Sequence, residues 1–206
     1  TASSNSQLYL IGGFNFATGQ PWGSTTIYPG HLFIKIGGAA PPSAPLVNPV
    51  GGTVANSGYG FDYAIDLTYA LPSAGGAVSV IKVYDLNATT ILNTVQNDGF
   101  GSNPWKMRED ASSVPNSPFD AVIDTSGHFY KDQTSAQVGI VTGVTGLLDD
   151  NTTTDSTPGS TTATVPASYL TDWHHVVKID LGFLDALNIA EGTDVYFSYT
   201  MECGND

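Results

Sequence analysis

Apolar and polar residues alternate with a period of two along much of this chain, and no other feature constrains its fold as strongly. In the segment YGFDYAIDLTYA, residues 59–70, every second position carries a large apolar side chain. Successive side chains of a β-strand point to opposite faces. The segment therefore predicts a half-buried strand, with Phe61, Tyr63, Ile65, Leu67 and Tyr69 on one face and Asp62, Ala64, Asp66 and Thr68 on the other.

The same alternation, or a short apolar run, predicts further strands. Clusters of Gly, Pro, Asn or Ser bound each of them, as is typical of turns. One stretch, residues 183–192, has apolar spacings of one, three and four and predicts a short helical connector. The predicted strands cover residues 7–11, 31–36, 78–84, 90–95, 119–123, 137–141, 173–181 and 194–201.

Strands that follow one another without intervening helices favour antiparallel sheets packed face to face. We therefore predict an all-β fold, an antiparallel β-sandwich or jelly roll of about nine or ten strands with at most one short helix. Residues 1–206 form a single domain in this prediction, and residues 1–11 are a separable N-terminal arm and strand. Long helices are disfavoured because the chain has only three Glu and one Arg to coat them.

The chain is acidic, with 19 Asp and Glu residues against 6 Lys and Arg residues and a formal net charge of −13. Nucleic acid is excluded as a partner, because phosphate recognition depends on Lys and Arg. An anionic membrane surface is disfavoured for the same reason. The sequence also has no run of 18 apolar residues to span a bilayer, so we expect no membrane contact in the mature form.

Motifs of nucleophilic, metal or nucleotide catalysis are missing from the sequence. The segment nearest to a hydrolase G-x-S-x-G elbow, ANSGYG, has Ala55 in place of the first Gly. His174 and His175 are neighbours on a predicted strand, so they point to opposite faces and cannot share a metal. Asp62 and Asp66 share a strand face, but a solvated face is a better interpretation than a glycosidase pair. We predict that the protein is not an enzyme.

Oxygen donors cluster in the segment DDNTTTD, and Ca²⁺ prefers such ligands. The segment is not an EF-hand, because it lacks Gly at the sixth position and Glu at the twelfth. Ca²⁺ is therefore the one candidate cofactor, and a plain surface loop is the alternative. The candidate ligands are Asp149, Asp150, Asn151 and Asp155.

Two further sets of residues are candidates for surface chemistry. Asn87 and Asn151 each begin an N-glycosylation acceptor pattern, although the pattern is common by chance in a Thr-rich chain. Trp22, Tyr28 and Trp105 stand in segments rich in Gly and Pro, where aromatic rings could stack on sugars. The favoured alternative for the three rings is a place in the core or at a subunit contact.

The N-terminal segment SQLYLIGGF predicts a strand that could complete the sheet of a neighbouring subunit. Leu8 and Leu10 occupy alternate positions of this strand, behind the arm of residues 1–6. Addition of such a strand to an exposed sheet edge is a common mode of assembly. The candidate assembly residues are Leu8, Tyr9, Leu10 and Ile11, and pairing of this strand within its own subunit is an equal alternative.

Three stretches carry a resemblance to a known class of protein: YGFDYAIDLTY with VSVIKVYDLN, DWHHVVKIDLGFLDA, and above all FSYTMECGND. They resemble bacterial exported proteins with a PEP-CTERM sorting tail, which exosortase processes. The resemblance implies export to the bacterial cell surface, a signal peptide that has been removed, and a sorting tail after Asp206 that is absent from this sequence. We expect Cys203, the single cysteine, to be a buried small side chain and not an intermolecular disulfide.

These observations predict a structural subunit of an extracellular surface matrix, such as a biofilm matrix, or of a filament. The predicted partner is the protein itself, and the second candidate is an extracellular polysaccharide. The alternative function is that of a surface adhesin or carbohydrate-binding module. A third, less favoured hypothesis is an enzyme with the same fold that acts on polysaccharides.

Overall fold

A computed structural model describes residues 6–12, 19–22, 24–42, 52–70, 78–97, 100–108, 115–131, 138–141 and 174–202. The predicted all-β antiparallel fold is confirmed, because every strand in these residues pairs in the antiparallel sense. Fifteen strands are described, and several are only two or three residues long. Helical structure in these residues is confined to short 3-10 turns, and none of it is long and apolar enough to cross a membrane.

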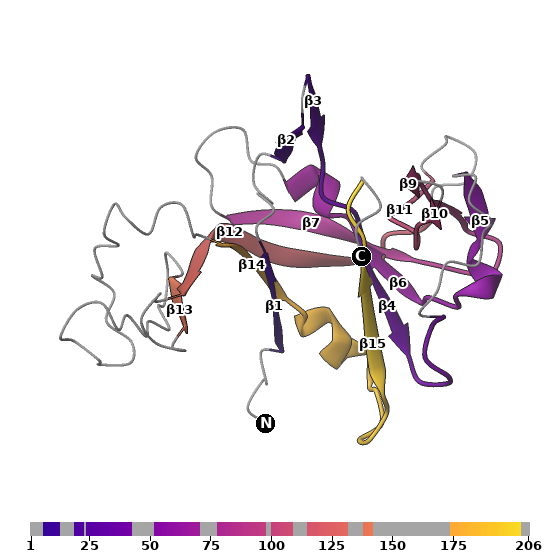
Figure 1. Cartoon of the computed structure of the whole chain (residues 1–206). Helices are drawn as coiled ribbons and strands as arrows, with labels where there is room; N and C mark the ends of the chain where they lie inside the picture. Colours follow the sequence, from indigo (N-terminus) through magenta and orange to yellow (C-terminus); the bar gives the residue numbers. More distant parts are fainter. Residues whose placement is uncertain are drawn as a thin grey trace.

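One large sheet dominates the fold (Figure 1). Its strands follow the order β1-β14-β12-β7-β6-β4-β15, and β13 pairs with the second half of β12. The chain therefore visits the sheet out of sequence order, and its first strand lies beside a strand close to its C-terminal end. The bounds are β1 (Gln7–Gly12), β14 (His174–Asp180), β12 (Phe119–Lys131), β7 (Val78–Asp85), β6 (Tyr63–Ile65), β4 (Leu32–Ile36), β15 (Val195–Tyr199) and β13 (Val138–Val141).

Three smaller units accompany the main sheet. A three-stranded sheet of β11 (Lys106–Met107), β8 (Ile91–Asn93) and β5 (Thr53–Ala55) lies on the right of Figure 1, with the pair β9 (Gln96–Asn97) and β10 (Phe100–Gly101). The hairpin of β2 (Gln20–Trp22) and β3 (Thr25–Ile27) projects from the top of the same view.

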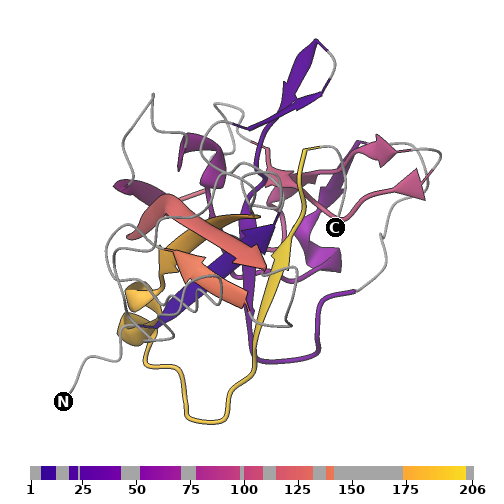
Figure 2. The same ribbon diagram turned by 60° about the vertical axis from the view of Figure 1, so that its left-hand side comes forward.

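The first core cluster lies on one face of the main sheet, which curls around it. Leu8 and Leu10 from β1 pack against this cluster, and so does Val195 from β15 at the opposite edge. Two edges of a seven-strand path can share one core only if the sheet curls, and Figure 2 shows both edge strands on the same side of the molecule. The buried members are Leu32, Ile34, Ile65, Leu67, Ile81, Val83, Ala121, Ile123, Val177, Ile179, Leu181 and Phe183.

The second core cluster lies between the other face of the main sheet and the three-stranded sheet. Phe33 from β4 packs there with Leu92 from β8 and Met107 from β11. The ring of Phe61 stacks on those of Phe33 and Tyr59, with centroid separations of 4.8 and 5.5 Å. Because Leu32, Phe33 and Ile34 are all fully buried, β4 is covered on both faces, as in a sandwich.

The predicted strand over residues 61–69 is shorter than expected. Only Tyr63–Ile65 form a strand, and Leu67–Ala70 form the 3-10 turn η2. The prediction that Phe61 shares a face with Tyr63 is wrong, since Phe61 belongs to the second cluster. The strand ends because Asp66 Oδ1 accepts hydrogen bonds from the backbone N–H and the hydroxyl of Thr68, a local turn that competes with the ladder.

The predicted helical connector is the 3-10 turn η4 (Gly182–Leu187). It ends at Asn188, whose φ of 50° lies in the left-handed region, and not at Gly192. Asn tolerates this conformation better than most residues. The turn places Phe183 in the first core cluster and leads the chain back to edge strand β15.

Candidate functional site

Strand β1 forms one edge of the main sheet, and β14 is its only strand partner among the described residues. The register places Leu8 opposite Ile179, Tyr9 opposite Lys178 and Leu10 opposite Val177. β14 begins at His174, close to the other end of the sequence. The first strand of the chain is therefore held by a partner that is distant in sequence.

The two faces of β1 differ in chemistry. Leu8 and Leu10 are half-buried and pack against the first core cluster. Tyr9 points to the other face, where its hydroxyl donates a hydrogen bond to Gln7 Oε1 at 3.0 Å. Ile11 continues the ladder opposite Val176, and its side chain lies outside the described residues. In this structure β1 pairs within its own chain, which is one of the two alternatives that the sequence left open.

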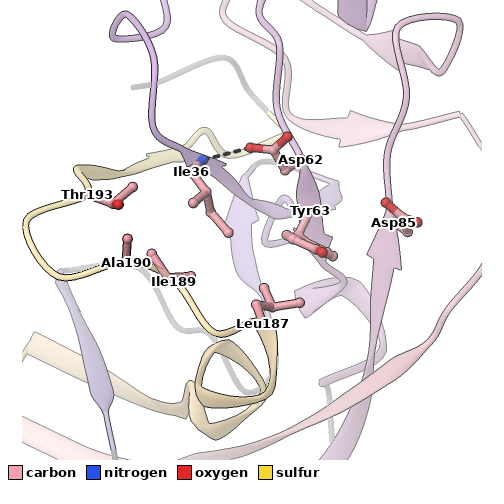
Figure 3. A pocket seen from close by; sticks show the side chains of 8 residues that line it. All are labelled: Ile36, Asp62, Tyr63, Asp85, Leu187, Ile189, Ala190 and Thr193. Atoms are coloured by element: carbon pink, nitrogen blue, oxygen red, sulfur yellow. Dashed lines mark hydrogen bonds between the residues drawn. The ribbon is translucent and has the colours of Figure 1, made fainter.

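A pocket of about 410 Å³ opens at the end of β4, β6 and β7 (Figure 3). The loop that follows η4 forms its second wall, so the pocket lies at one mouth of the curled sheet. Tyr63 stands between the two walls in Figure 3, with its hydroxyl end toward Asp85. The lining residues are Ile36, Asp62, Tyr63, Asp85, Leu187, Ile189, Ala190 and Thr193.

Two carboxylates define the electrostatics of this pocket. Asp85 lies directly opposite Tyr63 in the register of β6 and β7. Burial raises the pKa of the Tyr63 hydroxyl above its usual value, and the negative charges of Asp85 and Asp62 raise it further. Asp62 is held in place by its Oδ2 atom, which accepts a hydrogen bond of 2.7 Å from the backbone N–H of Ile36.

The ring of Tyr63 packs against two other aromatic rings. Its centroid lies 6.1 Å from that of Phe119 and 5.9 Å from that of Phe183, both in edge-on arrangements. Phe119 and Phe183 also contact each other, at 5.7 Å. Tyr63, which lines the pocket, is therefore packed against aromatic side chains of the main core.

The expected solvated face of Asp62 and Asp66 is not what the structure shows. Asp66 is fully buried, and its Oδ1 atom lies 3.1 Å from Nε2 of the equally buried His31. Burial by itself raises the pKa of Asp66, but contacts with His31 and Thr68 outweigh it and hold that pKa below its ordinary value. Asp62 instead lines the pocket, so one carboxylate faces the pocket and the other is buried beside His31.

The three candidate aromatic residues differ in their surroundings. Trp105 is 9 % exposed and belongs to the buried set, and Lys106 Nζ lies 4.6 Å from the centroid of its ring. Tyr28 is 43 % exposed, and its backbone N–H donates to Glu202 Oε2 at 2.9 Å. Trp22 lies in β2, and its side chain is outside the described residues. Of this trio, only Tyr28 presents a ring that is described as exposed.

Asn87 lies exposed in the turn between β7 and β8. Its Oδ1 atom accepts hydrogen bonds from the backbone N–H and the hydroxyl of Thr89, at 2.8 and 2.6 Å. The second acceptor pattern and the candidate calcium ligands fall outside the described residues, and so does Cys203. The second acceptor pattern begins at Asn151, and the candidate calcium ligands are Asp149, Asp150, Asn151 and Asp155. Within the described ranges, no three His, Cys, Asp or Glu residues gather into a group that could hold a metal ion.

Asn56 is a structural centre that sequence reasoning missed. Its buried amide donates to the backbone oxygens of Phe61 and Asn87, at 2.8 and 3.1 Å, and accepts from the N–H of Phe61 at 3.0 Å. The amide therefore ties the loop before β6 to the turn after β7. An Asn among Gly and Ser residues signals a turn in the sequence, but not which backbone groups it will satisfy.

Comparison with known proteins finds no match: no protein-family model, no curated protein and no solved structure is similar to this chain.

Proposed function

We propose that the protein is a structural subunit of an extracellular matrix or filament, in which β1 of one subunit pairs with β14 of the next. One observation carries this proposal: β1 is an edge strand at the start of the chain, and its described strand partner is near the other end of the sequence. The resemblance at residues 197–206 supports a place at the surface of a bacterial cell.

The exchange replaces each contact of β1 by the same contact made between two subunits. The ladder with β14 and the packing of Leu8 and Leu10 can be supplied by either chain, since both have the same sequence. The free energy of the two arrangements therefore differs mainly through linker strain and the entropy of association. A head-to-tail exchange whose rotation does not close into a ring continues from subunit to subunit, and its product is a filament.

The strong negative charge opposes this assembly and makes it conditional. Subunits with a formal net charge of −13 repel one another, and salt screens the repulsion over a distance of about 10 Å at 0.1 M. Assembly should therefore increase with ionic strength. An assembly held by pairs of opposite charges would show the reverse dependence.

A pair of cysteines across the β1–β14 ladder tests the exchange directly. Tyr9→Cys with Lys178→Cys, on a Cys203→Ser background, places two thiols directly opposite each other on neighbouring strands. Mild oxidation of concentrated protein should give a ladder of covalent oligomers on a non-reducing gel. A single monomeric species would show that β1 always pairs within its own subunit and would refute the proposal.

The matched control is Lys82→Cys with Asp120→Cys on the same background. These residues are also directly opposite, but β7 and β12 lie inside the sheet and cannot exchange without unfolding it. The control pair should close within each monomer under the same conditions. A ladder from both pairs would indicate random collisions between subunits and would count against strand exchange.

A further inference from the structure

The pocket at the mouth of the curled sheet combines an acidic side with an apolar side. Asp62 and Asp85 stand on the sheet side, close enough to Tyr63 to raise the pKa of its hydroxyl. Leu187 and Ile189 stand on the facing loop. A ligand that fills this space must therefore offer positive charge at one end and aliphatic surface at the other.

The two carboxylates have no cation of their own among the described residues. Three lysines make contacts outside the pocket. Lys82 forms an ion pair with Asp120, and Lys35 donates a hydrogen bond to the backbone oxygen of Tyr59. The ammonium group of Lys106 lies over the ring of Trp105. Asp85 forms no described salt bridge, and the hydrogen bond of Asp62 involves only its Oδ2 atom. Asp85 is exposed to solvent and Asp62 is half-buried, so a cationic ligand can reach both carboxylates, and neither forms an ion pair within the described residues.

We propose that this pocket binds a small organic cation, a primary ammonium group on an aliphatic chain. The ammonium group lies between Asp62 and Asp85 and beside the Tyr63 ring, where charge-assisted hydrogen bonds and a cation–π contact favour it. The aliphatic chain packs on Leu187 and Ile189. This proposal is independent of strand exchange, because the pocket contains no residue of β1 or β14.

Other ligand classes fit the pocket less well. A calcium ion takes six to eight oxygen ligands, whereas the pocket offers two carboxylates and a wall of aliphatic side chains. A neutral sugar would gain no charge–charge attraction from the two carboxylates. An ammonium group supplies three hydrogen-bond donors and one positive charge, which matches the acidic side of the pocket.

Titration of the isotope-labelled full-length chain with 1,5-diaminopentane tests the proposal by NMR. Saturable shifts should be confined to the amides of β4, β6 and β7 that line the pocket and to the loop 187–193. Pentane-1,5-diol, which has the same shape without the charge, should leave these amides unchanged. The absence of saturable shifts with the diamine, or equal shifts with the diol, would overturn the proposal.

Two single substitutions separate the pocket from the general charge of the protein. Asp85→Asn removes one pocket carboxylate and should weaken binding of the diamine about tenfold, the effect of about 1.4 kcal/mol. Asp120→Asn removes the same charge from the outer face of the sheet and should leave binding unchanged. Equal weakening by both substitutions would mean diffuse attraction to an acidic surface and would overturn the assignment.

Two further arms distinguish alternative occupants. Calcium chloride should not compete with the diamine; competition at lower concentration than the diamine itself would identify a metal site and overturn the proposal. Dilution of the free protein should leave the pocket amides unshifted. Shifts on dilution would show that a lysine of a second copy occupies the pocket, which would also overturn the assignment to a small ligand.

Discussion

His31 and Asp66 form a fully buried polar pair, with Nε2 of the imidazole 3.1 Å from Oδ1 of the carboxylate. The other ring nitrogen, Nδ1, accepts a hydrogen bond from the backbone N–H of Met107 at 3.4 Å. Nε2 therefore carries a proton, and this proton faces the carboxylate. The pair joins the residue before β4 to the residue after β6, and through Met107 it joins the main sheet to the three-stranded sheet.

Removal of the carboxylate should destabilise the protein strongly. Asp66→Ala leaves Nε2–H of the buried His31 and the N–H of Thr68 without their acceptor, and each unsatisfied buried donor costs about 1–3 kcal/mol. The measurement is the free energy of unfolding in urea. Asp120→Ala is the control, because Asp120 and Lys82 are 52 % and 58 % exposed and an exposed pair contributes about 0–1 kcal/mol. Similar losses from both substitutions would contradict a special role for the buried pair.

Stability should fall in acid partly because of Asp66. The pKa of this group is lower in the folded protein than its ordinary value of 3.8, so the unfolded chain takes up the proton first as the pH falls. The stabilisation is thus fully present above about pH 5 and is lost as the pH falls below the ordinary pKa and through the folded one. Urea midpoints measured from pH 7 to pH 3 should decline more steeply for the natural chain than for Asp66→Asn. Parallel curves would show that other carboxylates dominate.

Gly30 should not tolerate any side chain. A Cβ atom at this position would overlap the backbone oxygens of Thr200 and Trp105, and backbone atoms cannot move aside as a flexible side chain can. Gly30→Ala should therefore cost about 3 kcal/mol or more, or prevent folding. Gly192→Ala is the control, because its Cβ meets open space and only its φ of 82° is unfavourable, at a cost of about 1–2 kcal/mol. Thermal unfolding should give a lower melting temperature for Gly30→Ala than for Gly192→Ala; the reverse order would contradict the prediction.

The alternation of side chains predicted the strands well where a strand is long enough to show it. β14 and β15 fall inside the predicted segments, because a period of two is a property of the extended backbone itself. It could not predict that Phe33, on the second face of β4, is buried as deeply as Leu32. The strands that cover Phe33 are β8 and β11, and two or three residues are too few to display a period.

The candidate sites were only partly visible in the sequence, for a related reason. The strand β1 can be predicted from the sequence because its residues are contiguous. The pocket was not, because Ile36, Asp62, Asp85 and Ile189 are brought together by strand order and by the loop after η4. The alternation predicts a solvated Asp66, because that face of a regular strand is exposed. In the structure a turn at Thr68 and the side chain of His31 enclose the carboxylate.

The amide of Asn56 should be as important as a core side chain. Asn56→Ala removes three hydrogen bonds and leaves the N–H and the carbonyl oxygen of buried Phe61 without a partner. Each unsatisfied buried group costs about 1–3 kcal/mol, so the two groups together should cost about 2–6 kcal/mol. Calorimetric unfolding measures the loss. Asn93→Ala, in a half-buried position of β8 that pairs through its backbone, should cost much less; an equal cost would contradict the account.

The stability of the pairing between β1 and β14 should depend on which face of β1 carries a substitution. Leu10→Asp places a charge against the first core cluster and should release β1, so amides of β14 that bond to β1 should exchange with solvent many times faster. Tyr9→Asp places the same charge on the opposite face and should leave their protection nearly unchanged. Hydrogen exchange read by mass spectrometry on peptides from residues 174–180 makes the comparison. If both substitutions gave equal exchange, β1 would be held by its backbone ladder alone, and the packing of its leucines would not govern strand release.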